Sequence, residues 1–257
     1  MRAGTDEAVV SAIIPCFDEA AAIGPLVRGL LAVGVDEALV VDGGSGDGTP
    51  EIAAAAGARV IVEPRRGYGR ACAAGVAAAR DDATVLVFID GDGSDDPASA
   101  PSIIGPVIEG QADFCLASRL SAGREAGSMA PSQVLAGRLA GFLMRARYGV
   151  RYTDMAPFRA IRRDRLEALG MIETTYGWNL EMQMRAAACG LMIREVPVRC
   201  RRRAGGRSKV SGDWRAVAPV ALNLAATFLR IAVRQPAPNQ AMSRTSAPSP
   251  MPERTNS

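Results

Sequence analysis

The chain has 257 residues, 48% of them hydrophobic, and a formal net charge of +3. This length and composition predict a globular protein with one sizeable core, and so small a net charge gives no reason to expect a nucleic-acid partner. The chain contains no histidine, which excludes triads that need imidazole, HExxH zinc sites and histidine proton shuttles.

The cysteine and hydropathy patterns bear on the cellular compartment. The five cysteines are scattered and form no CxxC pair, a pattern typical of reduced thiols in a cytosol rather than of a disulfide framework or a zinc site. The N-terminus lacks the apolar segment of a secretory signal. No apolar stretch of about 20 residues occurs, so no conventional membrane-spanning helix is expected. We expect a cytoplasmic protein, either soluble or peripheral at the inner face of the membrane.

The first half of the chain alternates β-rich runs with helical patterns. Strands are predicted over residues 8–15, 37–42, 58–63, 84–90 and 112–119, and helices over residues 19–34, 50–57 and 70–80. Asp18 and Thr49 are the predicted N-caps of the first two helices, and Gly24-Pro25 indicates a break or a late start in the first. Such alternation is the signature of an α/β fold with a doubly wound, mainly parallel sheet flanked by helices.

The second half of the chain is less regular. An amphipathic helix is predicted over residues 131–149, with Arg138 on its polar side, and a helix with core methionines over residues 177–190. A strand is predicted over residues 191–201. Residues 199–209 contain five arginines and one lysine around two glycines. This basic cluster is either a solvated charge run or a mobile loop that closes over an anion.

The C-terminal region divides into two parts. Residues 213–234 form a predicted amphipathic helix, whose apolar core is short for a membrane span and is interrupted by Pro219 and Asn223. This helix either lies at a membrane interface or packs on the domain. Residues 235–257 are rich in Pro, Ser, Thr and Asn and form a predicted disordered tail. The globular domain is therefore expected over residues 1–212.

Three aspartates follow predicted strands. Asp42 ends the second strand, and Asp90 and Asp92 end the fourth, so all three are expected in one crevice beyond the carboxyl ends of the strands. The alternatives are an Asx-type turn at Asp42 and a solvated acidic turn at the other two. Carboxylates this close repel one another, and a bound cation removes that cost.

The residue types also indicate a class of ligand. An oxygen-only ligand set favours Mg²⁺ or Mn²⁺, which complete their coordination with phosphate oxygens of a substrate. Such a metal, together with basic residues, stabilises the negative charge on a leaving diphosphate. Nucleotide-sugar chemistry and nucleotidyl transfer both fit. Walker and Rossmann phosphate loops are disfavoured, because the chain has no GxxxxGK[ST] motif and no GxGxxG that opens a helix after the first strand.

Eight segments of the chain fall in a characteristic order. They are SAIIPCFDEAAAI, VVDGGSGDGT, RGYGRACAAGVAAA, VFIDGDGSDDP, LASRL, TDMAPFRAIRRDRL, WNLEMQMRAAACG and VPVRCRRRAGGRSK. In this order the chain resembles the family 2 glycosyltransferases of GT-A fold, close to the dolichol-phosphate (polyprenyl-phosphate) mannosyltransferase branch, over residues 9–212. The resemblance implies an inverting, metal-dependent enzyme that moves a sugar from a nucleotide-diphosphate sugar, GDP- or UDP-linked, to a polyprenyl phosphate.

The resemblance also implies roles for individual residues. The implied nucleotide-sugar binding residues are Pro15, Phe17, Glu19, Asp42, Asp90 and Arg119. The implied metal ligands are Asp90, Asp92 and Ser94, with Asp95 as a substitute for Ser94, where relatives often have glutamine. The implied acceptor-phosphate residues are Arg138, Arg207 and Lys209. Catalytic roles are assigned to Asp92, Asp154 and Arg207.

Two positions depart from the family's pattern. Gly43 stands where relatives usually have a second aspartate after Asp42, and Ala156-Pro157 replaces a Ser-Gly pair beside Asp154. The second departure bears on the geometry of the acceptor site and on a catalytic role for Asp154.

The nature of the acceptor decides whether a protein base is needed. A lipid phosphate needs none, because the second pKa of a phosphate monoester is about 6. A hydroxyl acceptor needs a carboxylate base, for which Asp154 and Asp95 are the choices. Two alternatives to transfer to a polyprenyl phosphate remain. One is a family 2 enzyme with a soluble hydroxyl acceptor, and the other is a non-catalytic nucleotide-sugar binding module. A nucleic-acid binder is disfavoured, because no aromatic residue is interleaved in the basic cluster.

Overall fold

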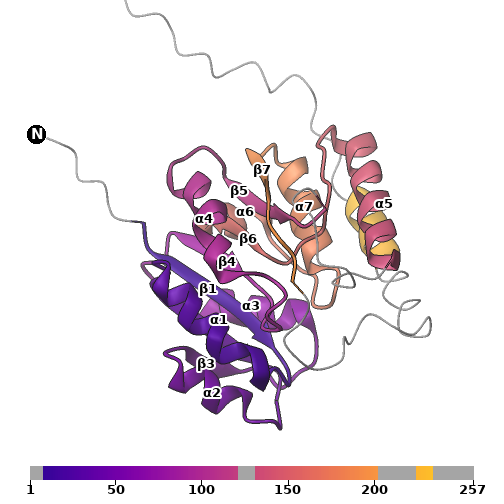
Figure 1. Ribbon diagram of the computed structural model, residues 1–257. Helices are drawn as coiled ribbons and strands as arrows, with labels where there is room; N and C mark the ends of the chain where they lie inside the picture. Colours follow the sequence, from indigo (N-terminus) through magenta and orange to yellow (C-terminus); the bar gives the residue numbers. More distant parts are fainter. Residues whose placement is uncertain (1–7, 121–130, 202–223, 234–257) are drawn as a thin grey trace, which may run out of the picture.

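The computed structural model describes residues 8–120, 131–201 and 224–233 (Figure 1). Within them, one seven-stranded sheet has the order β3-β2-β1-β4-β6-β5-β7. Its strands are β1 (Val10–Cys16), β2 (Glu37–Asp42), β3 (Arg59–Val62), β4 (Val85–Phe88), β5 (Phe114–Ser118), β6 (Arg159–Arg162) and β7 (Ile193–Pro197). The helices are α1 (Ala20–Ala32), α2 (Thr49–Ala55), α3 (Tyr68–Ala78), α4 (Ala100–Ile108), α5 (Pro131–Tyr148), α6 (Arg163–Leu169) and α7 (Trp178–Ala188), with a 3₁₀ turn η1 (Pro97–Ser99) and a helical stretch at residues 224–233.

The predicted mainly parallel sheet is confirmed. β1 pairs in parallel with β2 and β4, β2 with β3, and β5 with β7. Among the described strands, only β6 runs against its neighbours, β4 and β5. The sequence did not predict β6, because its four residues include Arg159 and Arg162 and show no apolar run. Hydrogen bonding to a strand on each side stabilises its extended conformation.

Helices cover both faces of the sheet (Figure 1). α1, α2 and α4 pack on one face and contribute to a core that includes Ile14 and Val40. α3, α5, α6 and α7 pack on the other face, in a core that includes Ile13, Leu39 and the buried Met182. Successive residues of β1 and β2 therefore point into two different cores, which explains why these strands are apolar at nearly every position.

Helix α1 begins differently from the prediction. Asp18 is not its N-cap, because its backbone is left-handed (φ 54°) and its Oδ1 accepts the N–H of Gly46 at 3.0 Å. The N-cap is Glu19, which makes no side-chain cap hydrogen bond. Instead, the hydroxyl of Thr49 accepts the N–H of Glu19 at 2.9 Å. The loops that follow β1 and β2 are therefore tied together at the carboxyl edge of the sheet.

Two further helix predictions are wrong. Thr49 is the first residue of α2, and the N-cap is Gly48 in the left-handed conformation. Helix α1 runs through Pro25 without a break. Proline removes one hydrogen bond of the helix, but burial of the neighbouring Ile23 and Leu26 offsets that loss.

Gly75 brings α3 close to the sheet, since a Cβ there would lie 2.3 Å from Ile13 Cγ2 and 3.1 Å from Val41 Cγ2. We predict that Gly75→Val lowers the free energy of unfolding by roughly 2–3 kcal/mol, because the helix must move away from the strands. Ala77→Val, at an exposed position of the same helix, is the control and should cost at most about 1 kcal/mol. Urea unfolding measures both changes, and equal losses would contradict close packing at Gly75.

Candidate active site

A cavity of about 400 Å³ opens at the carboxyl ends of β1, β2 and β4. Its wall contains five residues predicted from the sequence, Pro15, Phe17, Glu19, Asp90 and Asp92. It also contains Gly43, Glu63, Arg65, Arg66, Gly67, Tyr68, Thr175 and Tyr176. This location is the one expected for a ligand site in an open parallel sheet.

The carboxylates that follow β4 are buried rather than solvated. Oδ1 of Asp90 and both carboxylate oxygens of Asp95 are buried without a hydrogen-bond partner in the described part of the chain. Burial, and after it the charges of Asp92 and Asp95, raises the pKa of Asp90 to about 7. Burial also raises the pKa of Asp95 to about 6, against the opposing effect of Arg119. The alternative of a solvated acidic turn is therefore wrong.

The remaining acidic residues of this segment hold its turn. Asp92 Oδ1 accepts the N–H of Ser94 at 2.9 Å, and the carbonyl of Ser94 accepts the N–H of Arg201 at 2.9 Å. Asp96 caps η1 and forms an ion pair with Arg201. Ser94 is 9% exposed and is not among the residues that line the cavity. Asp90 and Asp92 are thus the carboxylates of this segment that line the cavity, in addition to Glu19 and Glu63 from other segments.

These residues fit a divalent cation that binds together with a ligand. The described residues contain no group of three cysteine, aspartate or glutamate side chains arranged to hold a metal ion. Asp90 and Asp92 nevertheless supply oxygen ligands at the wall, and the unpartnered Oδ1 of Asp90 is an atom that a cation would satisfy. Mg²⁺ usually takes one or two carboxylates and completes its coordination with water and phosphate oxygens.

Asp42 ends β2 but is not among the residues that line the cavity. Its Oδ2 accepts the N–H groups of Gly44 (2.8 Å) and Ser45 (2.9 Å), and its Oδ1 accepts the hydroxyl of Ser45. The alternative of an Asx-type turn at this position is therefore confirmed. Gly43 occupies the place at the cavity wall that the sequence predicted for Asp42.

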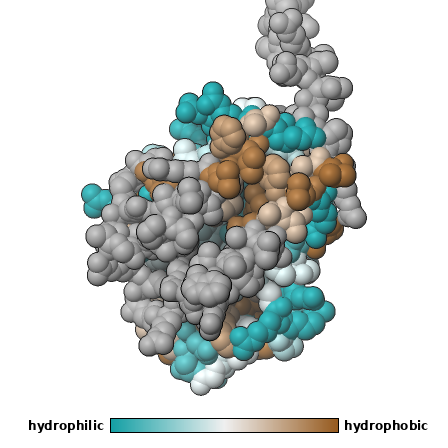
Figure 2. Space-filling view, turned by 90° about the vertical axis from the view of Figure 1, so that its right-hand side faces the viewer, coloured by the Kyte–Doolittle hydropathy of each residue, from teal (hydrophilic) through white to brown (hydrophobic). Residues whose placement is uncertain are grey.

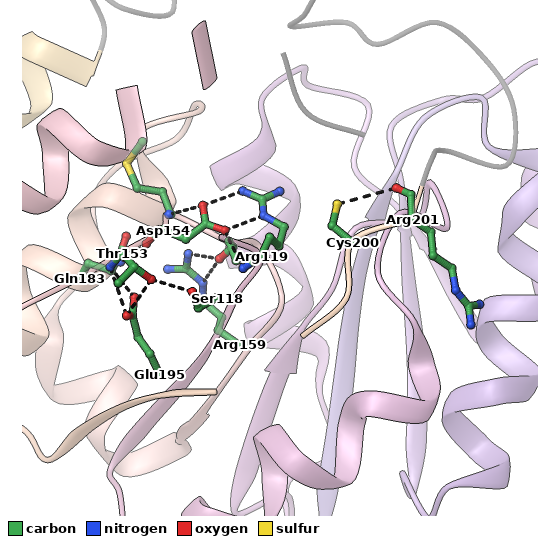
Figure 3. A network of polar contacts seen from close by, with 11 residues as sticks. Ser118, Arg119, Thr153, Asp154, Arg159, Gln183, Glu195, Cys200 and Arg201 are labelled. Atoms are coloured by element: carbon green, nitrogen blue, oxygen red, sulfur yellow. Dashed lines mark hydrogen bonds and ion pairs between the residues drawn. The ribbon is translucent and has the colours of Figure 1, made fainter. Parts of the chain in front are cut away.

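Arg119, which is partly exposed, forms an ion pair with the buried Asp154 (Figure 3). Arg119 Nε and Nη2 donate to the two oxygens of Asp154 at 2.7 and 2.9 Å, and the N–H of Met155 donates to Oδ1 at 2.7 Å. Burial raises the pKa of Asp154, but the hydrogen bonds and charge of Arg119 outweigh it and hold this pKa below its ordinary value. The sequence assigned the two residues separate roles, and neither is among the residues that line the cavity.

Polar contacts from β5, β7 and α7 support this ion pair (Figure 3). Gln183 Nε2 donates to the carbonyl of Asp154 at 3.0 Å. Thr153 donates its N–H and its hydroxyl to Glu195, and its hydroxyl lies 2.6 Å from that of Ser118. Asp154 is therefore fixed through its side chain and through its backbone.

The segment with Ala156 and Pro157, where the chain departs from the family's pattern, is held by a buried arginine. Arg159 is fully buried, and its guanidinium donates to the carbonyl of Ala156 and to that of Asn179. Ala156 is fully buried as well. An arginine from β6 thus holds the segment beside Asp154 in place (Figure 3).

Two arginines of the cavity wall were not predicted. The guanidinium carbon of Arg66 lies 4.2 Å from the centre of the Phe17 ring, in a cation–π contact. Arg65 forms an ion pair with Glu63 at 2.8 Å, and hydrogen bonds from Arg65 lower the pKa of Glu63 to about 2. The available signal was the pair of arginines before Gly67, the second of which begins the segment RGYGRACAAGVAAA that contributes to the family resemblance.

Three predicted acceptor-phosphate residues lack a described side chain. Arg207 and Lys209 lie outside the described residues, and the side chain of Arg138, in α5, is also outside them. The predicted C-terminal helix is described, and is helical, over residues 224–233. The predicted tail at residues 235–257 lies outside the described part.

Known proteins are similar to this chain in sequence. Residues 11–170 match the family model described as Glycosyl transferase family 2. An uncharacterized glycosyltransferase of Mycobacterium tuberculosis is 38% identical over 207 residues, which cover 80% of this chain and 91% of the relative. An undecaprenyl-phosphate mannosyltransferase of Micrococcus luteus is 35% identical over 216 residues, which cover 79% of this chain and 88% of the relative.

Solved structures are similar in fold. Glucosyl-3-phosphoglycerate synthase from Mycobacterium tuberculosis, in complex with Mn²⁺, UDP-glucose and phosphoglyceric acid, matches with a TM-score of 0.68 and 22% identity. The match covers 91% of this chain and 82% of that chain. At this identity the likeness concerns the fold alone, and it confirms the GT-A class expected from the sequence.

Asp90→Asn is predicted to stabilise the metal-free protein at alkaline pH. The pKa of Asp90 is about 7 in the folded protein against an ordinary 3.8, so the folded state holds a proton that the unfolded state has released. The folded state therefore loses stability as the pH rises through this window. In EDTA, we expect the free energy of unfolding of the variant to exceed that of the wild type by roughly 1–3 kcal/mol at pH 8 and by less at pH 5.

Asp81→Asn is the control, because Asp81 is exposed and its replacement should change the free energy of unfolding by no more than about 0.5 kcal/mol at either pH. Urea unfolding of the three proteins at pH 5 and pH 8 measures these differences. If Asp90→Asn does not raise the free energy of unfolding, or raises it equally at the two pH values, the result would contradict a buried charge at Asp90.

Proposed function

Since the chain belongs to glycosyl transferase family 2, we propose that it transfers a sugar, with inversion at the anomeric carbon, from a nucleoside diphosphate sugar to a polyprenyl phosphate. The observation that carries the proposal is the pair of carboxylates, Asp90 and Asp92, on the wall of a cavity at the carboxyl ends of the strands. A module that only bound nucleotide sugar would have no need of a buried, unpartnered carboxylate oxygen there, because such an atom lowers stability.

The cavity supports a GDP- or UDP-linked sugar as the donor. Its volume of about 400 Å³ is within the range of small-molecule pockets. Phe17 and Arg66 offer an aromatic and a planar cationic surface on which a base can stack. We propose that Pro15 and Glu19 contact the nucleoside and that Arg119 contributes its positive charge to the diphosphate.

The resident cation in this proposal is Mg²⁺ or Mn²⁺, with Asp90 and Asp92 as its protein ligands and Ser94 or Asp95 beside them. When bound, the cation would stabilise the negative charge that develops on the leaving nucleoside diphosphate. The chain's own contribution is orientation, since the N–H of Ser94 fixes Oδ1 of Asp92 at 2.9 Å.

The state of Asp154 favours a phosphate acceptor. Its two oxygens bind Arg119, and its pKa lies below the ordinary value, so it is a weak base. A phosphate monoester is mostly ionised near pH 7 and attacks without a protein base, in agreement with a chain that has no histidine. An acceptor phosphate oxygen forms the bond to the anomeric carbon as the bond to the diphosphate breaks. We propose that Arg138, Arg207 and Lys209 bind this phosphate.

A soluble hydroxyl acceptor is the second candidate. Asp95 carries a buried carboxylate without a partner in the described part of the chain, and its pKa of about 6 suits a group that accepts a proton near neutral pH. The solved synthase that matches in fold holds phosphoglyceric acid, a small soluble compound.

We further propose that the enzyme acts as a peripheral protein at a cytoplasmic membrane surface. No helix of the described residues is long and apolar enough to cross a membrane. The apolar side chains of Leu139 and Phe142 in α5, and of Leu229 and Val233 in residues 224–233, are exposed, Phe142 by 68% and Val233 by 84%. Brown side chains gather on this face in Figure 2. Neither stretch contains Asp or Glu, so anionic headgroups would meet no repulsion from them.

Transfer of radiolabel tests the acceptor. The protein is incubated with labelled UDP-glucose or GDP-mannose, Mg²⁺ or Mn²⁺, and either polyprenyl phosphate or 3-phosphoglycerate. We expect label in the organic-extractable product and none when EDTA is present. Label that appears only in the 3-phosphoglycerate product would assign a soluble acceptor instead, and no transfer from either donor would contradict both acceptors.

Asp92→Ala should reduce this metal-dependent transfer by at least about 100-fold, because it removes a metal ligand on which leaving-group stabilisation depends. Asp82→Ala is the control, since Asp82 is exposed and pairs only with the exposed Arg80 among the described residues. Metal-dependent turnover by Asp92→Ala at the wild-type rate would refute the metal assignment.

Vesicle binding tests the membrane proposal. We expect the double variant Phe142→Ser, Leu229→Ser to bind vesicles of phosphatidylglycerol and phosphatidylcholine about fivefold or more weakly than wild type, because it removes apolar area that enters the interface. Val62→Ser on the edge strand β3, exposed by 62%, should bind as wild type does. Cosedimentation measures both, and equal binding by all three proteins would exclude this face as the contact.

A further inference from the structure

The loop between α6 and α7, residues 170–177, forms part of the cavity wall through Thr175 and Tyr176. Its backbone packs directly against the first turn of α3, where Gly69 N–H donates to the carbonyl of Thr175 at 3.2 Å and Arg70 N–H to that of Thr174 at 3.1 Å. A Cβ at Gly69 would lie 2.5 Å from a carbonyl oxygen of this loop. The wall on this side therefore depends on where the loop sits.

Glu173 joins this loop to residues 224–233. Its Oε1 accepts the N–H and the hydroxyl of Thr175 at 3.0 and 2.7 Å. Its Oε2 accepts the hydroxyl of Thr227 at 3.0 Å and forms an ion pair with Arg230. One carboxylate thus holds the cavity-wall loop with one oxygen and the C-terminal helical residues with the other.

The surroundings of Glu173 make this connection tight. Glu173 is 5% exposed and Thr227 is 2% exposed. Burial raises the pKa of Glu173, but hydrogen bonds from Thr175, Arg230 and Thr227 outweigh it and lower the pKa to about 2. A Cβ at Gly177 would lie 2.7 Å from the Thr227 hydroxyl oxygen. The contact is therefore close-packed and carries a full negative charge opposite Arg230.

We infer that residues 224–233 are a positioning element of the nucleotide pocket, in which Thr227 and Arg230 hold Glu173 and Glu173 holds Thr175 and its neighbour Tyr176 in the cavity wall. The inference rests on the proposed function in one respect, that the cavity binds the nucleotide of the donor. Glu173, Thr227 and Arg230 are positioning residues, since none of them lines the cavity.

The same helical residues also carry an exposed apolar side, with Leu229 exposed by 63%. A partner that binds this exposed apolar side would shift residues 224–233 and, through Glu173, the cavity wall. Because coupling between two sites is reciprocal, nucleotide binding should in turn steady residues 224–233.

The first test measures affinity for UDP and GDP with Mg²⁺ by calorimetry, well below the melting temperature of each protein. Arg230→Gln and Thr227→Val should each weaken binding of the preferred nucleotide by about three- to tenfold, the range expected for residues that couple two sites. Arg230→Lys, which keeps the charge, should restore part of the loss. In transfer assays the donor KM should rise while kcat stays within about twofold.

Arg162→Gln is the matched control, because it also removes an arginine–carboxylate ion pair, that of Arg162 with Asp164, at an exposed position of β6. This variant should bind nucleotide as the wild type does. If Arg230→Gln and Thr227→Val both bind nucleotide with the affinity of the wild type, the inference is overturned and the proposed function stands. A wild type that binds neither UDP nor GDP would overturn both.

Hydrogen exchange of the wild-type protein tests the same coupling without any substitution. Adding the preferred nucleotide should slow amide exchange in residues 224–233 by about threefold or more, as well as in the cavity-wall loop. Slower exchange confined to the loop, with residues 224–233 unchanged, would contradict the coupling even if a variant failed to fold.

Discussion

Negative charge buried at the carboxyl end of β4 constrains the rest of the site. Asp90 and Asp95 keep carboxylate oxygens out of water without a hydrogen-bond partner in the described part of the chain, and such atoms destabilise a fold. The sheet tolerates them because β4 is buried throughout and paired on both sides, with β1 and β6. The positive charge of Arg119 offsets part of the cost of these buried carboxylates, and a proton or a bound cation would offset more of it.

Asp154, outside the cavity wall, and Asp90, in that wall, have opposite electrostatic environments. Asp154 is neutralised inside the protein by Arg119, which holds its pKa below the ordinary value, whereas burial raises the pKa of Asp90 to about 7. Environments that push the pKa values of neighbouring acids apart commonly separate their chemical roles. The ion pair with Arg119 thus satisfies Asp154 inside the protein, whereas Oδ1 of Asp90 has no hydrogen-bond partner among the described residues. This difference is consistent with the proposal that Asp90 binds a cation.

The antiparallel strand β6 explains how distant segments meet at this site. Phe88 at the end of β4 pairs with Arg159 at the start of β6, so the residues before β6 lie beside those that follow β4. Asp154 lies near Asp95 for this reason, and its negative charge contributes to the raised pKa of Asp95. The chain then continues through α6 into the loop with Glu173, which closes another side of the cavity.

The sequence by itself determined the α/β class, the strands β1 to β5 and the placement of Asp90 at the carboxyl edge of the sheet, because apolar runs and strand ends are local patterns with a known spatial consequence. The resemblance to family 2 glycosyltransferases implied that Pro15 and Phe17 belong to the same site, and both line the cavity with Asp90. The end of the second predicted strand also placed Asp42 at this cavity. In the structure, the Asp42 carboxylate instead accepts hydrogen bonds from Gly44 and Ser45 in its own loop. Only the tertiary structure decided the pairing of Arg119 with Asp154, the cation–π contact of Arg66 with Phe17 and the ion pair of Glu173 with Arg230. The two ion pairs join residues that are 35 and 57 positions apart, and a charged side chain can pair with any opposite charge that folding brings near. Its partner therefore depends on strand order and direction rather than on sequence pattern.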